Sequence, residues 1–116
     1  MTQNILKNIE TGKVLELGAL VPYQPGQVVS RTLVQNGAVG ITLFAFDENE
    51  EISAHKSDGD AVVTILEGAA KITIGETAHT VKQGETIVMP AGVPHAVAAD
   101  GRFKMALIVI FPQAGQ

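Results

Sequence analysis

The three histidines are the residues of this sequence best suited to acid–base chemistry or metal binding, because the chain contains no cysteine. The stretch GETIVMPAGVPHAV, residues 84–97, places His95 directly behind two prolines and a glycine, which make a stiff turn. His55 stands in the stretch ISAHKSDGD, residues 52–60. We expect each imidazole to open a β-strand beside a glycine-bearing turn and both to share one site. Two neighbouring imidazoles can donate hydrogen bonds, act as a general base or bind a divalent metal ion.

The third histidine, His79, lies in GETAHTVKQG, a stretch that predicts a short hairpin strand. We interpret His79 as a partly exposed strand residue outside the site.

The second half of the chain consists of short apolar runs between glycines, a pattern typical of an all-β sandwich or barrel. The runs are AVVTIL, KITI, TIVM and FKMALIVIF. Six glycines mark the turns around them: Gly59, Gly68, Gly75, Gly84, Gly92 and Gly101. The first half repeats the pattern more loosely in KVLELGALV, GQVVSRTLV and VGITLFAF, and only residues 3–10 indicate a short helix.

The composition narrows the classes of partner. The chain has 116 residues, enough for one domain, and only 17% of them are charged, against roughly 25% in soluble domains. Since several strands are also apolar on both faces, we expect a homodimer. The net charge of −4 and the scattered basic residues argue against a nucleic-acid partner. No run is long enough to span a membrane and no secretion signal is visible, so we expect a cytoplasmic protein without a membrane partner.

The spacing around His95 resembles the second motif of the cupin superfamily. That motif is a glycine, five residues, Pro-x-Gly, two residues and a histidine, which the chain matches from Gly84 through Pro90 and Gly92 to His95. The first cupin motif is matched at its two ends, by His55 and Gly68.

The resemblance covers roughly residues 38–111 and implies an all-β double-stranded β-helix, a jelly-roll-like cupin barrel in a single domain. Residues 38–116 would form the barrel core. Residues 1–37 would add an N-terminal segment and strands to the barrel and to the dimer interface.

The resemblance also implies that the stiff turn directs His95 into the mouth of the barrel. Cupins that hold a metal usually offer three histidines and a glutamate, but here Ser57 and Ala61 stand at two of these four positions. Catalytic metal sites normally keep at least three protein ligands, so a divalent metal would be held only weakly by His55 and His95. Asp60 could join them through a bulge, although we favour a turn aspartate that accepts backbone amides.

Candidates for the pocket lining are residues on the histidine-bearing faces and on strands that could reach the mouth. They are Val63, Ile65, Met89, Val97, Phe44, Phe46, Lys104 and Met105. Most of these are also ordinary core residues of small barrels. Lys104, inside an apolar run, either reaches solvent at a sheet edge or places a cation in the cavity.

We therefore expect a barrel that binds, or slowly transforms, a small organic molecule in a mainly apolar cavity centred on His55 and His95. Two alternatives stay open. One is a non-catalytic sensor barrel that only binds its ligand, and the other is a metal-dependent cupin dioxygenase or isomerase. Whether the chain is an enzyme is not decided by its sequence, because cupin barrels host many chemistries.

Overall fold

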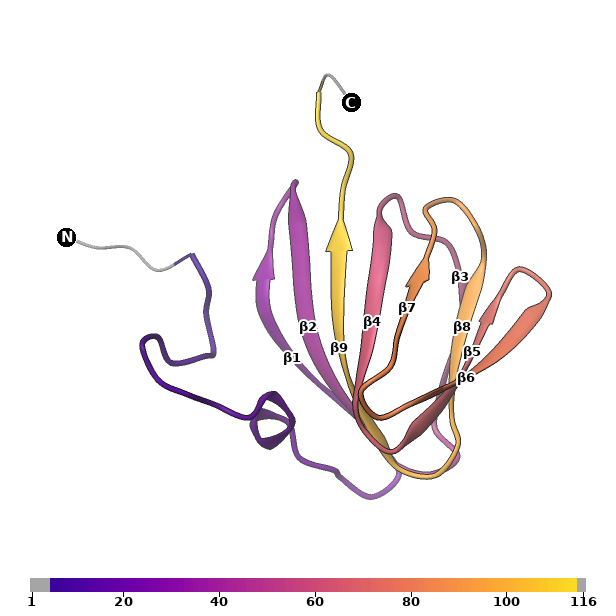
Figure 1. Ribbon diagram of the computed structural model, residues 1–116, viewed down its shortest axis with the longest axis horizontal. Helices are drawn as coiled ribbons and strands as arrows, with labels where there is room; N and C mark the ends of the chain where they lie inside the picture. Colours follow the sequence, from indigo (N-terminus) through magenta and orange to yellow (C-terminus); the bar gives the residue numbers. More distant parts are fainter. Residues whose placement is uncertain (1–4, 115–116) are drawn as a thin grey trace.

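The computed structural model describes residues 5–114, which form nine β-strands in two antiparallel sheets (Figure 1). The five-stranded sheet has the order β1 (Val28–Gln35), β2 (Val39–Phe46), β9 (Phe103–Ile110), β4 (Asp60–Glu67) and β7 (Thr86–Met89). The four-stranded sheet has the order β3 (Glu51–His55), β8 (His95–Ala99), β5 (Ala69–Ile74) and β6 (Thr77–Lys82). The predicted all-β barrel in one domain is confirmed.

The turns between strands fall where the glycines predict them. Gly68, between β4 and β5, has a φ of 77°, which residues other than glycine rarely adopt. A Cβ atom at this position would also collide with the carbonyl oxygen of Arg102, just before β9. Glycine at this position therefore allows the end of β4 to lie against the backbone of Arg102.

The main core lies between the two sheets. Phe46 and Phe103 stack with their ring centroids 4.4 Å apart, next to the fully buried Ile72 of the opposite sheet. Side chains of β7 alternate between the two faces of the sheet, since Met89 is 2% exposed and its neighbour Val88 is 50% exposed. Alternation along the strands thus separates the inner face from the outer face, as predicted.

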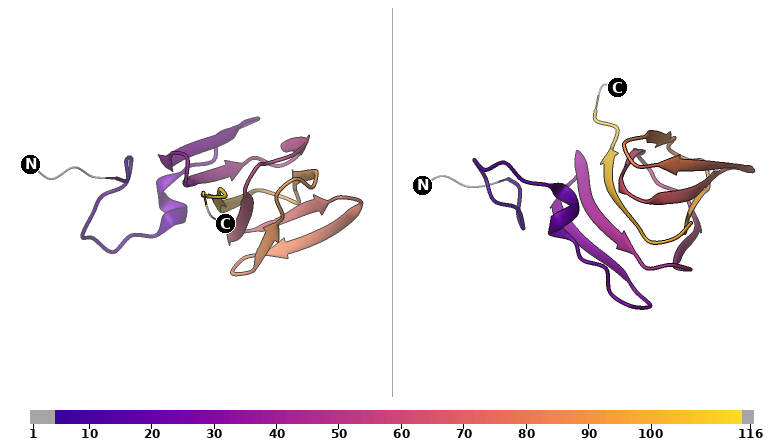
Figure 2. Two further views of the ribbon diagram at one scale, coloured as in Figure 1. Left: turned by 90° about the horizontal axis from the view of Figure 1, so that it is seen from above. Right: turned by 60° about the horizontal axis from the view of Figure 1, so that its bottom comes forward.

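The N-terminal segment lies on the outer side of the five-stranded sheet (Figure 2). Its residues 13–21, expected to form a strand, instead contain the 3₁₀ helix η1 (Leu17–Leu20). They cross the face of the sheet and pack Val21 into an outer apolar cluster with Leu33 and Leu43, so their backbone does not lie along the β1 edge as a further strand.

The predicted helix over residues 3–10 is not formed in residues 5–10, and residues 3–4 lie outside the described residues. β1 belongs to the predicted N-terminal part of the chain and forms one edge of the five-stranded sheet. Among residues 5–114 no helix has the length and apolar character needed to cross a membrane.

Candidate functional site

His55 and His95 lie side by side on neighbouring strands of the four-stranded sheet. They are direct partners in the register of β3 and β8, and their ring centroids are 4.4 Å apart at an interplanar angle of 71°. His95 opens β8 as predicted, but His55 closes β3 instead of opening a strand. Because β3 and β8 run antiparallel, the last residue of one meets the first residue of the other. His79 is exposed on β6, away from this pair.

The stiff turn before His95 is fixed to its surroundings by backbone hydrogen bonds. The amide of Gly92 donates to the carbonyl of Ser57 at 2.9 Å, which ties the turn to the segment after His55. The amide of Gly75 donates to the carbonyl of Pro94 at 2.8 Å. His95 is therefore held firmly and is 3% exposed, whereas His55 is exposed at the rim.

Both imidazoles present the same ring nitrogen to the backbone. Nδ1 of His55 lies 3.1 Å from the carbonyl oxygen of Ser53, and Nδ1 of His95 lies 3.3 Å from that of Val93. A carbonyl oxygen only accepts hydrogen bonds, so Nδ1 carries the hydrogen in both rings. Nε2 is then a hydrogen-bond acceptor while the ring is neutral and a donor when the ring is protonated.

The Nε2 atom of His95 is open to the cavity beside it. In the part of the chain that the structure describes, no buried side-chain nitrogen or oxygen lacks a hydrogen-bond partner. The hydrogen bond found for the His95 ring involves Nδ1 and not Nε2. Nε2 is therefore not fully buried. Burial lowers the pKa of His95, the positive charge of a protonated His55 lowers it further, and the hydrogen bond to Val93 acts in the opposite direction. The ring is thus neutral at neutral pH.

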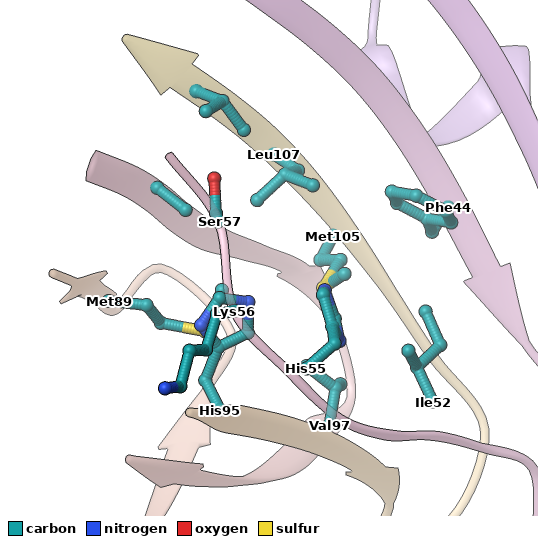
Figure 3. A pocket seen from close by; sticks show the side chains of 12 residues that line it. Phe44, Ile52, His55, Lys56, Ser57, Met89, His95, Val97, Met105 and Leu107 are labelled. Atoms are coloured by element: carbon teal, nitrogen blue, oxygen red, sulfur yellow. The ribbon is translucent and has the colours of Figure 1, made fainter. Parts of the chain in front are cut away.

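A cavity of about 280 Å³ opens beside the two imidazoles, between the sheets (Figure 3). Its polar lining consists of His55, Lys56, Ser57 and His95. Its apolar lining consists of Phe44, Ile52, Ala61, Met89, Val97, Met105, Leu107 and Val109. The lining includes the predicted Phe44, Met89, Val97 and Met105. Both sheets contribute, so the cavity depends on the closed barrel.

Three predicted lining residues, Val63, Ile65 and Phe46, belong to the solid core instead. They face inward, as expected, but they are at most 1% exposed and pack among other inward side chains. Each lies two or more residues further along its strand than a lining residue, Ala61 on β4 or Phe44 on β2. The period of two predicts the face of a side chain but not its depth along the barrel.

Lys104 does not enter the cavity, and its strand is not at a sheet edge. β9 lies between β2 and β4, and the Lys104 side chain extends over the outer face of the sheet. There Nζ donates a hydrogen bond to the carbonyl of Gly18 at 2.7 Å and lies 4.8 Å from the ring centroid of Tyr23. The lysine therefore helps to hold the N-terminal segment against the barrel.

Asp60 is not a third ligand beside the histidines. Its carboxylate accepts a hydrogen bond from the amide of Ala91 at 2.8 Å, the turn role that the sequence favoured. Asp60 starts a regular strand directly before the inward-facing Ala61, so its side chain points outward. Asp60 and Ala61 pair in unbroken register with Ile110 and Val109 of β9, so no bulge turns the side chain inward.

The donor set does not fit a tightly held metal ion. Within residues 5–114 no three His, Cys, Asp or Glu side chains lie close enough together to hold one. The two imidazoles are half of the usual cupin set, and Ser57 and Ala61 line the cavity at the other two positions.

Six lining residues were not among the sequence candidates for the pocket: Ile52, Lys56, Ser57, Ala61, Leu107 and Val109. Leu107 and Val109 lie two and four residues beyond Met105 on β9, so strict alternation would have found them. Ile52 and Lys56 depend on the pairing of β3 with β8, which a single sequence does not reveal.

Comparisons with known proteins identify the family to which this chain is similar. A family model described as a cupin domain matches residues 42–111. The crystal structure of a conserved protein of unknown function from Streptococcus pyogenes is 48% identical, with a TM-score of 0.95, over 98% of this chain and 100% of that chain. A cupin superfamily protein from Desulfitobacterium hafniense DCB-2 is 34% identical, with a TM-score of 0.88, over 92% and 98% of the two chains.

More distant structures share only the fold. Salicylate 1,2-dioxygenase from Pseudoaminobacter salicylatoxidans is 17% identical, with a TM-score of 0.67, over 77% of this chain and 26% of that chain. No curated protein matches the sequence. Because the family model covers more than half of the chain and the second cupin motif carries His95 into the cavity, this protein belongs to the cupin superfamily.

Proposed function

We propose that this cupin binds a small organic molecule, with the apolar part of the ligand between the sheets and its polar group at His55 and His95. The observation that supports the proposal is a pair of imidazoles whose ring centroids lie 4.4 Å apart, beside an otherwise mainly apolar cavity of about 280 Å³. Mainly apolar pockets with a few convergent polar groups are typical ligand sites. The volume is near the lower end of their range, which favours a small ligand.

Binding, with slow chemistry at most, is better supported than metal-dependent catalysis. A metal-dependent cupin dioxygenase or isomerase needs a firmly held ion, and two imidazoles without a third ligand supply too few donors. Proton transfer needs no metal, and a neutral His95 with an open Nε2 is suited to act as a general base on a bound molecule. A divalent ion held weakly by the two imidazoles stays a prediction, as does a cytoplasmic location.

A screen by NMR tests the proposed site directly. Small organic molecules are added singly to protein with labelled histidines, and the ring signals are followed. Ligands of the cavity should shift the signals of His55 and His95 and leave those of the distant His79 unchanged. If every binding molecule moves His79 alone, or none moves the pair, the cavity is not the binding site.

We further propose that two copies of this chain pair through the outer face of the five-stranded sheet. A lateral row of apolar residues crosses all five strands in register: Val34, Ile41, Ile108, Val62 and Val88. At one end of the row Val88 is 50% exposed, and the N-terminal segment leaves Ile5 82% exposed. Val34, at the other end of the row, is 6% exposed. A two-fold axis would bring the Val88 end of the row and the exposed part of the N-terminal segment in one copy against those of the other, in a self-complementary interface.

A further inference from the structure

The titratable side chains that line the cavity are all basic. Lys56 is a fixed cation, and the two imidazoles can each take up a proton. No acidic residue is among those that line the cavity, although the chain has 12 acidic and 8 basic residues. Asp58 and Asp60 are neighbours of lining residues in the sequence but do not line the cavity, and Asp60 is hydrogen-bonded to Ala91. The mouth is therefore suited to a negative charge and has nothing to pair with a positive one.

We infer that the ligand of this cavity is a small monocarboxylate with an apolar body, an inference that rests on the proposed function. Lys56 can donate to one carboxylate oxygen, and the hydroxyl of Ser57, which accepts from the amide of Gly59 at 3.2 Å, still has its own hydrogen to donate. Nε2 of a neutral His95 can accept a hydrogen bond from a protonated carboxyl group. Nε2 of a protonated His95 can donate one to a carboxylate. Hydrogen bonds to a charged group are the stronger kind.

The position of these groups fits a molecule with one charged end. In Figure 3 Lys56, Ser57 and His95 lie to one side of His55, and Phe44 and Ile52 lie to the other. A carboxylate among the polar side chains would leave the rest of the molecule against apolar side chains, which favour its removal from water. Lys56 alone carries a permanent charge, so a single negative charge is matched better than the two of a phosphate monoester.

Calorimetry with three probes of one shape tests the inference. Octanoate, octanamide and octylamine have the same chain and differ in the charge of the head group. Octanoate should bind about tenfold or more tightly than the other two, as expected for hydrogen bonds to a charged group. Hexanoate should bind more weakly than octanoate, by about fourfold for each methylene removed.

A pair of matched variants locates the charge. Lys56→Gln should weaken octanoate binding by about two- to fivefold, since this lysine is exposed, and leave octanamide binding unchanged. Lys71→Gln, at an exposed lysine of β5 that does not line the cavity, should change neither. Equal binding of octanoate and octanamide, or preference for octylamine, would overturn the inference and leave the proposed function standing. If none of the three probes binds, the inference fails, and the NMR screen of the histidine signals decides the proposed function separately.

Discussion

At the scale of single residues, the site depends on the different environments of two adjacent imidazoles. His95 is buried and held by the stiff turn, whereas His55 lies at the rim. Burial and the charge of a protonated His55 both keep the pKa of His95 below its usual value. A neutral His95 at physiological pH follows from this asymmetry, and with it an Nε2 atom that can accept a proton.

The first prediction is that His55→Gln raises the pKa of His95 towards its ordinary value, because it removes the neighbouring positive charge. NMR titration of the His95 ring measures the change, and His79→Gln, on exposed β6, is the matched control that leaves the titration unchanged. The same midpoint for His95 in the parent and in His55→Gln would show that the rings do not interact.

The lowered pKa of His95 also sets the sign of a stability change with pH. Between the unfolded-state pKa of roughly 6.5 and the lower native value, the unfolded chain binds more protons than the native protein. The free energy of unfolding therefore falls as the pH decreases through this window, measured by urea unfolding at a series of pH values. A conservative variant, His95→Gln, should lose less stability over the same window than the parent does.

A third prediction concerns the two positions at which this chain departs from metal-binding cupins. Ser57 and Ala61 both line the cavity beside the histidines, so Ser57→His with Ala61→Glu should complete a four-ligand set. Calorimetry with zinc and nickel should show a gain larger than the about 10–100-fold that second-shell changes produce. Ser30→His, at an exposed position of β1, should give no gain. An unchanged affinity in the double variant would mean that the mouth cannot bring the ligands together.

At the scale of elements, the glycine turns decide where strands end, and they differ in what they require. Gly68 and Gly84 both have positive φ, but only Gly68 also approaches a neighbouring backbone, at Arg102. Gly84→Ala should lower the free energy of unfolding by about 1–2 kcal/mol through left-handed strain alone. Gly68→Ala should cost about 1–3 kcal/mol more, because the added methyl collides with a carbonyl. Equal midpoints in urea for the two variants would refute this reading of the turn.

The elements also show how far the sequence predicts this molecule. Alternation and glycine spacing predicted the strands of the second half and the inward face of Met89, because both follow from local geometry. The pattern of residues 13–21 predicted a strand wrongly, since alternation does not reveal whether a segment pairs along the edge of a sheet or packs across its face.

The site itself was predicted only in part. The motif around His95 and the first-motif histidine identified the two imidazoles, and the faces of Phe44 and Met105 followed from their strands. Depth along the barrel separated Phe44 from Phe46, and only the pairing of β3 with β8 brought Lys56 to the cavity. These are properties of the packed sheets and not of any one strand.

At the scale of the whole molecule, the apolar row on the five-stranded sheet, exposed at its Val88 end, leads to a prediction about assembly. The parent should sediment as a dimer of the 12.2 kDa chain at micromolar concentration. Val88→Lys, at the exposed end of the row, should shift the equilibrium to monomer because it places a charge in an apolar interface. Thr80→Lys, exposed on the other sheet, is the matched control and should remain dimeric. A parent that sediments only as a monomer would contradict the proposed pairing.

The central claim is that the cavity between the sheets holds the ligand, and filling the cavity tests it most directly. Ala61 is 1% exposed and lines the cavity, so Ala61→Met places apolar atoms where the ligand body would lie. Calorimetry with the tightest-binding compound from the NMR screen should show affinity lowered at least about tenfold, the loss of two or more buried methylenes, in a variant that still unfolds cooperatively. Ala78→Met, on exposed β6, should bind like the parent. Binding of equal affinity to Ala61→Met and to the parent would contradict the account.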